Sequence, residues 1–277
     1  MALTVLNNIA GLSAQNSLAT TQAGLTQTLQ ALSSGKRINS GADDAAGLAI
    51  ANGLHANITA LTQSVRNATD GVGMLQVADG ALSQITTLLN RAVTLATESA
   101  TGTVSDSQRG ALETEFAAIQ AEIDTIGVNT TYNGQAIFGS GASLTVFMSD
   151  SSSAGTTSVT VNMGVVDSGN LGTSSIASDD LSTAGGAQSA LTNINAAIAG
   201  IAALRGSLGA SSNQLQAASN VMASQITNLS NAENNIMAAD IGQETAQLSQ
   251  GTILQQTGIA ALQQSNQMQQ SVLKLLQ

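Results

Sequence analysis

Residues 194–236 read INAAIAGIAALRGSLGASSNQLQAASNVMASQITNLSNAENNI, and this stretch decides the fold. Apolar residues recur there at seven-residue intervals: Ile194, Ile201, Leu208, Leu215, Met222, Leu229 and Ile236. Because seven residues are close to two helical turns and no proline intervenes, these side chains form one seam of a single long helix. A second seam is weaker: Leu191, Ile198 and Ile226 fit it, whereas Arg205, Ser212, Ser219 and Glu233 do not. At ~1.5 Å per residue this helix is a rod, so its seam requires a second rod alongside.

A second helix with the same period begins at Ala45 and supplies that partner. Its seam consists of Leu54, Leu61, Ala68, Leu75, Leu82, Leu89 and Ala96. The run from Gly102 to Asp106 predicts a loop. A third helix follows, with apolar residues alternately four and three apart at Leu112, Phe116, Ile119, Ile123 and Ile126, and we expect it to end at Gly127.

The two ends of the chain read as amphipathic arms. Residues 1–39 place Leu18, Leu25, Leu29 and Leu32 on a helical stripe, and residues 238–277 do the same with Leu248, Leu254, Leu262, Val272 and Leu276. The turn-forming residues between Ser33 and Gly41 end the helix of the first arm before the second helix begins. Ser40 and Asp43 resemble a capping box, and we expect Asp43 and Asp44 in the first turn of the second helix.

Between the rods the pattern changes to that of a strand. Val159, Val161, Met163 and Val165 alternate with polar residues, residues 143–147 form a shorter candidate strand, and residues 151–155 read as a loop. The predicted fold is mainly α: long antiparallel, coiled-coil-like rods with a small β insertion at their tip and helical terminal arms. The expected divisions are 1–41 for the N-terminal arm, 42–138 and 187–238 for the rods, 139–186 for the insertion and 239–277 for the C-terminal arm.

Composition excludes several classes of function. The net charge is −10 with seven basic residues, which argues against nucleic acid and against anionic membranes. No cysteine and one histidine argue against cysteine catalysis, a His-based triad and a thiolate or multi-histidine metal site. We expect no enzyme, no cofactor and no metal centre. No apolar run is long enough to insert in a membrane, and residues 1–12 lack the positive charge of a cleaved secretory signal. Aromatic residues make up 1% of the chain, which favours thin cores between helices.

The arms predict assembly. Residues 1–39 hold few large apolar side chains, each worth at best ~2 kcal/mol when buried, against ~1–2 kcal/mol of backbone entropy for each residue ordered. An isolated helix is marginal. We therefore expect the arms to order when neighbouring copies of the chain cover them.

Three sets of motifs resemble bacterial flagellins. They are LSSGKRINS at 32–40 with DDAAGLAIA at 43–51; DSQR at 106–109, Glu115-Phe116 and NTTYNG at 129–134; and ILQQ at 253–256, SNQ at 265–267 and VLKLL at 272–276. The resemblance covers residues 1–138 and 187–277, and the short segment between them is similar to the family's variable outer region. It implies a filament subunit whose terminal helices form the inner core, exported unfolded through the flagellar type III apparatus. It further implies a cytoplasmic export chaperone, a cap protein and hook–filament junction proteins as partners.

The resemblance also implies contacts with host immune receptors. Residues 30–51 are similar to the segment that a plant receptor kinase senses, which points to Arg37, Asp43 and Asp44. The animal Toll-like receptor pattern LQRMREL corresponds to LNRAVTL at 89–95, where Arg91 and Leu95 match and two positions lose their charges, while Glu115 matches the acid on the neighbouring helix. A further departure is Gln269, where the family usually has proline, so the last helix is expected to run on unbroken.

Four functions compete at this point. The filament subunit is favoured, and a hook–filament junction protein of the same superfamily is the near alternative. A type III translocator needs a long apolar segment that the sequence lacks. An enzyme needs a nucleophile–base set or a phosphate loop, and neither is present.

Overall fold

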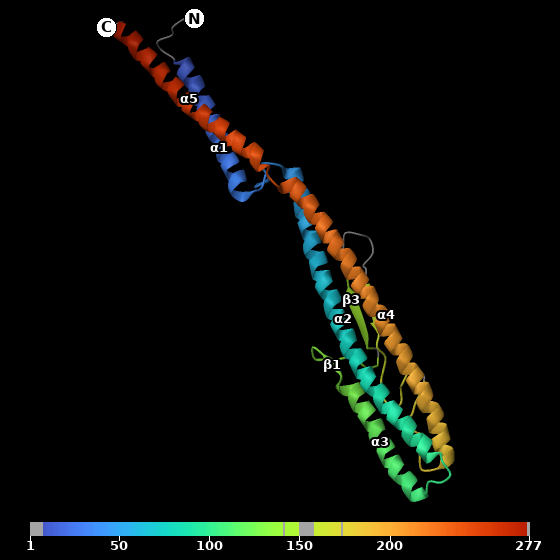
Figure 1. Ribbon diagram of the computed structural model, residues 1–277. Coiled ribbons are helices and arrows are strands. Elements are labelled where there is room, and N and C mark those ends of the chain that lie inside the picture. Colours follow the sequence, from blue (N-terminus) through green and yellow to red (C-terminus); the bar gives the residue numbers. More distant parts are fainter. Residues whose placement is uncertain (1–7, 141, 150–157, 173, 276–277) are drawn as a thin grey trace. The chain divides into compact units, whose positions relative to one another are not determined.

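The computed structural model describes residues 8–140, 142–149, 158–172 and 174–275 (Figure 1). These residues form five α-helices and two antiparallel two-stranded sheets, so the expected class, mainly α with a small β part, is confirmed. The elements are α1 (Ile9–Ser34), α2 (Ala45–Ser99), α3 (Asp106–Asn129), β1 (Thr131–Tyr132), β2 (Gln135–Ala136), β3 (Ser143–Phe147), β4 (Ser158–Asn162), α4 (Ala184–Met237) and α5 (Ile241–Leu275). The chain divides into two compact units: unit 1 comprises residues 1–56 and 228–277, and unit 2 comprises residues 57–227.

Helices α2 and α4 pair antiparallel in unit 2. Arg205 of α4 forms a two-pronged ion pair with Asp79 of α2 (Nε–Oδ1 2.7 Å, Nη2–Oδ2 3.2 Å), while Leu215, further along α4, meets Gly71, which comes earlier in α2. The ion pair explains why an arginine interrupts the second seam of α4. The predicted seam residues that are at most 6% exposed are Leu61, Leu75, Leu82, Leu89, Phe116, Ile119, Ile123, Ile194, Ile201, Leu208, Leu215 and Met222. Four others are half-buried: Leu54, Leu112, Leu229 and Ile236.

Helix α3 reverses the chain and lies against the distal half of α2. Ser105 and Gln108 form a capping box at its start, and the guanidinium of Arg109 donates to the carbonyl of Thr101 (3.0 Å). The predicted end at Gly127 was wrong, because the helix continues to Asn129. Gly127 serves a close approach instead: a Cβ there would lie 1.8 Å from the carbonyl oxygen of Val166.

The β insertion does not lie at the tip of the rods. Ser64 Oγ donates to the carbonyl of Ser149, and the Cβ missing from Gly71 would meet Val146 of β3 at 2.7 Å. These α2 residues lie tens of ångströms from the α2–α3 turn, at ~1.5 Å per residue. The reason is that α3 carries the chain back along α2 before the insertion begins. Strand β4 ends at Asn162, because Gly164 turns the chain with φ 68°, so Val165 is outside the strand. The predicted loop at 151–155 lies outside the described residues.

The chain then returns along α3 to the start of α4 through residues 163–172 and 174–183, which contain turns and two isolated β-bridges. Ser168 donates both its amide (2.6 Å) and its hydroxyl (3.2 Å) to the carboxylate of Asp124, and the Leu181 amide donates to Glu113 Oε2 (2.5 Å). Ser99 Oγ donates to the carbonyl of Leu181 (2.5 Å), which fixes this segment to the end of α2. The sequence patterns did not predict this path along α3, because the bonds that hold it to α2 and α3 join single backbone and side-chain groups that follow no repeat.

In unit 1, the link between α1 and α2 pairs with the link between α4 and α5. Gly35 closes α1 in the left-handed conformation (φ 68°), the amide of Arg37 donates to the Met237 carbonyl (2.7 Å), and the Ala239 amide donates to the Gly35 carbonyl (3.1 Å). Helix α2 begins at Ala45 as expected, but Asp43 and Asp44 precede it rather than occupying its first turn. Asp44 caps the helix by accepting from the Gly47 amide (2.8 Å).

Helix α5 runs unbroken past Gln269 to Leu275, as predicted from the missing proline. No helix in the described part of the chain is long and apolar enough to cross a membrane. The described residues also contain no group of three or more histidine or acidic side chains arranged to hold a metal ion.

Candidate assembly surface

Helices α1 and α5 form an antiparallel pair in unit 1. Leu25 lies over Gly251 and Leu18 over Gly258, so the partner number rises on α5 as it falls on α1. Ser265 Oγ donates to Asn8 Oδ1 (2.8 Å), which brings together residues from opposite ends of the sequence. The two terminal arms therefore pair with each other (Figure 1).

Small residues on α5 receive the leucines of α1. Gly251, Gly258 and Ser265 recur every seven residues, and so do Leu18 and Leu25. A Cβ at Gly251 would lie 2.7 Å from Leu25 Cδ2, so the glycine lets the leucine approach the helix backbone. The stripes predicted for the arms did not include this seam, because they consisted of large apolar residues only. The seven-residue spacing of small residues was the signal that could have revealed it.

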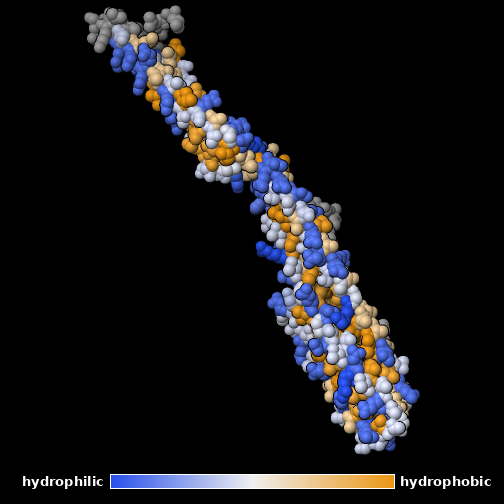
Figure 2. Space-filling model, in the orientation of Figure 1, coloured by the Kyte–Doolittle hydropathy of each residue, from blue (hydrophilic) through white to orange (hydrophobic). Residues whose placement is uncertain are grey.

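Most apolar side chains of the pair remain uncovered. On α1 only Gly11, Leu25, Thr28 and Ala31 are buried. Of the predicted arm residues, Leu18, Leu32 and Leu262 are half-buried, Leu29 is 53% exposed and Leu254 is 50% exposed, while the side chains of Val272 and Leu276 lie outside the described residues. Further exposed apolar residues of the pair are Ile9, Leu12, Ile241, Ile253, Ile259 and Met268. Figure 2 shows this apolar surface, in orange, over the two helices.

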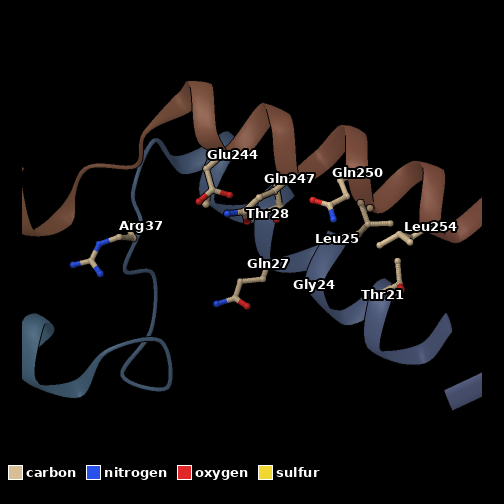
Figure 3. A pocket seen from close by; sticks show the side chains of 12 residues that line it. Thr21, Gly24, Leu25, Gln27, Thr28, Arg37, Glu244, Gln247, Gln250 and Leu254 are labelled. Carbon is tan, nitrogen blue, oxygen red and sulfur yellow. The ribbon is translucent and has the colours of Figure 1, made fainter. Parts of the chain in front are cut away.

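A groove of about 360 Å³ lies between the two helices and is lined at one point by Arg37 of the α1–α2 link. Figure 3 shows Leu25 and Leu254 at one end of it and the amide side chains of Gln27, Gln247 and Gln250 along its length. Arg37 and Glu244 bring one positive and one negative charge to its other end. The groove is therefore lined by apolar side chains at one end and by amide and charged side chains along the rest.

The α1–α2 link is held by carboxylates. Asp43 Oδ2 accepts hydrogen bonds from the amides of Asn39 (3.0 Å) and Ser40 (2.8 Å), and these bonds lower the pKa of Asp43. Arg37 donates to the carbonyl of Ile236 (2.8 Å) and lies 3.9 Å from Asp44. The three link residues predicted as plant-receptor contacts thus fall into two sets of contacts, Asp43 with Asn39 and Ser40, and Arg37 with Asp44. Arg37 and Asp43 are exposed and Asp44 is half-buried.

The residues predicted as animal-receptor contacts differ in exposure. Arg91 and Glu115 are exposed and form a two-pronged ion pair between α2 and α3 (Nε–Oε1 2.7 Å, Nη2–Oε2 3.1 Å). The pair lowers the pKa of Glu115 and raises that of Arg91. Leu95 was a wrong prediction: it is 0% exposed, because it faces the core rather than solvent.

An α-helical chain with a self-contained rod and a largely uncovered terminal helix pair defines a structural subunit of the kind that assembles with further copies. Residues 5–143 match the bacterial flagellin N-terminal helical region and residues 191–276 match the bacterial flagellin C-terminal helical region. The flagellin of Halalkalibacterium halodurans is 32% identical over 250 residues, covering 90% of this chain and 91% of that protein. The chain belongs to the bacterial flagellin family.

Other relatives match over shorter stretches. The B-type flagellin of Pseudomonas aeruginosa is 48% identical over 135 residues, which is 49% of this chain and 28% of that protein. The polar flagellin F of Vibrio parahaemolyticus is 42% identical over 135 residues and is matched over 36% of its length. A crystal structure of Bacillus cereus flagellin is similar with a TM-score of 0.49 and 28% identity, covering 61% of this chain and 94% of that one. The chain thus spans about a third of the length of the first two relatives.

Proposed function

We propose that this chain is a structural subunit that polymerises into the extracellular filament of the bacterial flagellum, and that the α1–α5 pair is its polymerisation core. The observation that supports this most directly is the uncovered apolar surface of the pair, from Ile9 to Met268, in a chain of the flagellin family. Water-exposed apolar side chains on this scale mark a surface that a partner covers. In a homopolymer the partner is another copy of the same pair.

The role proposed is mechanical rather than catalytic. The α2–α4 rod holds its shape through the buried seam, and the arms hold copies together. Before assembly the exposed arms require protection, which is the task of an export chaperone, and at the ends of the filament they meet cap and hook–filament junction proteins. The Arg91–Glu115 pair and the α1–α2 link residues Arg37, Asp43 and Asp44 are the surfaces we propose for host receptors. Arg91→Ala should weaken binding to the animal receptor, while the loss of the exposed ion pair with Glu115 should lower monomer stability only slightly, because exposed ion pairs contribute little.

Electron microscopy tests the polymer. Purified monomer is seeded with flagellar fragments, beside a truncated chain that lacks residues 1–39 and 240–277. We expect filaments from the full chain only. Circular dichroism of the truncated chain serves as the control, since retained helicity shows that the rod survives without its arms. Filaments from the truncated chain would remove the arms from the mechanism, and no filaments from the full chain would favour the junction-protein alternative.

A further inference from the structure

The β1–β2 hairpin turns on an asparagine–glycine pair. Tyr132 pairs with Gln135, so Asn133 and Gly134 form a two-residue turn, and both have positive φ (50° and 76°). Positive φ at both central residues defines a type I′ turn, for which asparagine followed by glycine is a preferred sequence. Asn133 is exposed, and nothing lies within 4 Å of the Cβ position of Gly134. In the described part of the chain, no hydrogen bond holds the Asn133 side chain or the Gly134 amide, so both groups are free to react.

Asn52 and Gly53 form the only other asparagine–glycine pair in the sequence, and they lie inside α2. Asn52 is also exposed, and the Cβ position of Gly53 also has nothing within 4 Å. In the helix, however, the amide of Gly53 donates to the carbonyl of Ala49, four residues earlier. The two pairs therefore match in side chain and exposure, and they differ in backbone conformation and in the bonding of the glycine amide.

An asparagine–glycine pair contains both the electrophile and the nucleophile of one reaction. Hydroxide removes the proton of the glycine amide, the nitrogen attacks the side-chain carbonyl carbon of asparagine, and the bond from this carbon to the side-chain nitrogen breaks. That nitrogen takes a proton from water and leaves as ammonia, which completes a five-membered succinimide. Water then opens one of the two ring C–N bonds and gives aspartate or isoaspartate, so that one water is consumed and one ammonia is released. Glycine suits the second position because it has no Cβ to crowd the attacking nitrogen.

Backbone conformation decides which of the two pairs can react. Ring closure moves the glycine nitrogen toward the asparagine side chain, and in α2 this movement would break helical hydrogen bonds around Gly53. In the hairpin, the Gly134 amide has no such bond to break, and strands β1 and β2 are two residues each. A two-stranded ribbon of this length is marginally stable and opens locally at low cost.

We propose that Asn133 is a deamidation site at which the amide of Gly134 is the nucleophile, and that α2 protects Asn52 from the same reaction. The inference goes beyond the proposed function and does not depend on it. Each event adds one negative charge to a chain of net charge −10. Aspartate tolerates the left-handed conformation of the turn, whereas isoaspartate adds a methylene group to the backbone and disrupts the turn. The isoaspartate product should therefore loosen the approach of Tyr132 to Gly73 of α2, where Oη lies 3.2 Å from the Cβ position of the glycine.

Incubation of the folded full-length chain at mildly alkaline pH tests the site, with deamidation measured at each asparagine by peptide mass spectrometry. Asn133 should react at least roughly tenfold faster than Asn52, because an amide inside a helix opens less often than a hairpin turn. In the chain unfolded in guanidinium, the two pairs should react within about threefold of each other, since neither is then held by structure. Isoaspartyl methyltransferase should label position 133 of the folded product, because opening of the ring gives isoaspartate whereas direct hydrolysis of the side chain gives aspartate alone.

The variant Asn133→Gln keeps the side-chain amide but lengthens the side chain by one methylene group, and it should remove the fast reaction. Equal rates at Asn133 and Asn52 in the folded chain would overturn the inference, as would a product at position 133 without isoaspartate. A difference of the same size in the unfolded chain would also overturn it, because the flanking residues rather than the fold would then set the rate.

Discussion

Both units contain antiparallel helix pairs, but only unit 2 covers most of its large apolar residues. The facing seams of α2 and α4 in unit 2 are almost fully buried, and α3, β3–β4 and the described residues between 163 and 183 pack around them. In unit 1, α1 and α5 bury one stripe leucine, Leu25. Nine of the thirteen large apolar side chains that are exposed in the described residues belong to unit 1, although it is the shorter unit. The same helical pattern thus produces a rod with a buried apolar seam in unit 2 and a helix pair with an exposed apolar surface in unit 1.

The largest expected effect breaks the finished unit. Leu215 is fully buried and meets Gly71 across the α2–α4 seam. Leu215→Asp buries a charge without a partner and should destabilise the monomer by roughly 4 kcal/mol or more, measured by thermal unfolding. Val221→Asp is the control on the same helix: the residue is 58% exposed, so the change should stay within ~0.5 kcal/mol. An unchanged melting temperature for Leu215→Asp would contradict the seam.

The next effect concerns the close approach that completes unit 2. Gly127→Ala forces Val166 away from α3 and strains the Ser168–Asp124 bonds beside it, which should cost about 1–3 kcal/mol in thermal unfolding. Gly110→Ala in the same helix is matched, since nothing lies within 4 Å of its added Cβ. That variant should gain ~0.5–1 kcal/mol. Equal effects of the two substitutions would show that residues 163–183 do not press on α3.

The sequence predicted the α2–α4 pair better than it predicted the helix ends and the insertion. The heptads from Ile194 to Ile236 predicted α4 and its partner α2, because a buried seam must repeat with the helix. The ends and the insertion were less predictable. Gly127 looked like a helix terminator, yet its role is to admit Val166. Leu95 looked like a surface contact from a motif, yet burial depends on which face of α2 meets its neighbours, and a motif does not encode this.

The unfinished unit should respond differently to truncation. Leu25→Ala removes the leucine that Gly251 receives, and because one side of the site is open to collapse, we expect the monomer to lose only ~1–2 kcal/mol in the α1–α5 pair. Leu29→Ala, at an exposed position, should leave the monomer within ~0.5 kcal/mol. Both should raise the critical concentration for assembly, since the polymer is proposed to cover both residues. Amide exchange in α1 measures the loss of stability in the α1–α5 pair, and seeded assembly measures the critical concentration. Normal assembly of Leu29→Ala would show that the exposed face of α1 around Leu29 is not part of the polymer contact.

The smallest expected effect is a pH dependence of stability that has opposite signs in the two units. Burial raises the pKa of Glu113 above its ordinary 4.5, and Asp180 raises it further, against the Leu181 amide bond that lowers it. Its contribution to stability is therefore full below pH 4.5 and is lost as pH rises through the higher folded value. Asp43 is opposite: amide bonds from Asn39 and Ser40 hold its pKa below its ordinary 3.8, so its contribution is present above pH 3.8 and is lost as pH falls through the lower folded value.

Thermal unfolding and amide exchange, measured between pH 3 and 7, separate these two contributions. The size of each change in unfolding free energy follows from the size of the pKa shift of that group. Glu113→Gln fixes a neutral side chain that still accepts from Leu181, and should flatten the loss of unit 2 stability above pH 4.5. Asp43→Asn should weaken the α1–α2 link near neutral pH and remove its acid dependence, seen in the amide signals of Asn39 and Ser40. Because the two carboxyl groups titrate with opposite signs, acid should tighten unit 2 at Glu113 before it loosens unit 1 at Asp43. If Asp43→Asn changed the pH dependence of stability in the same direction as Glu113→Gln, the hydrogen bonds from Asn39 and Ser40 would not hold Asp43 ionised in solution.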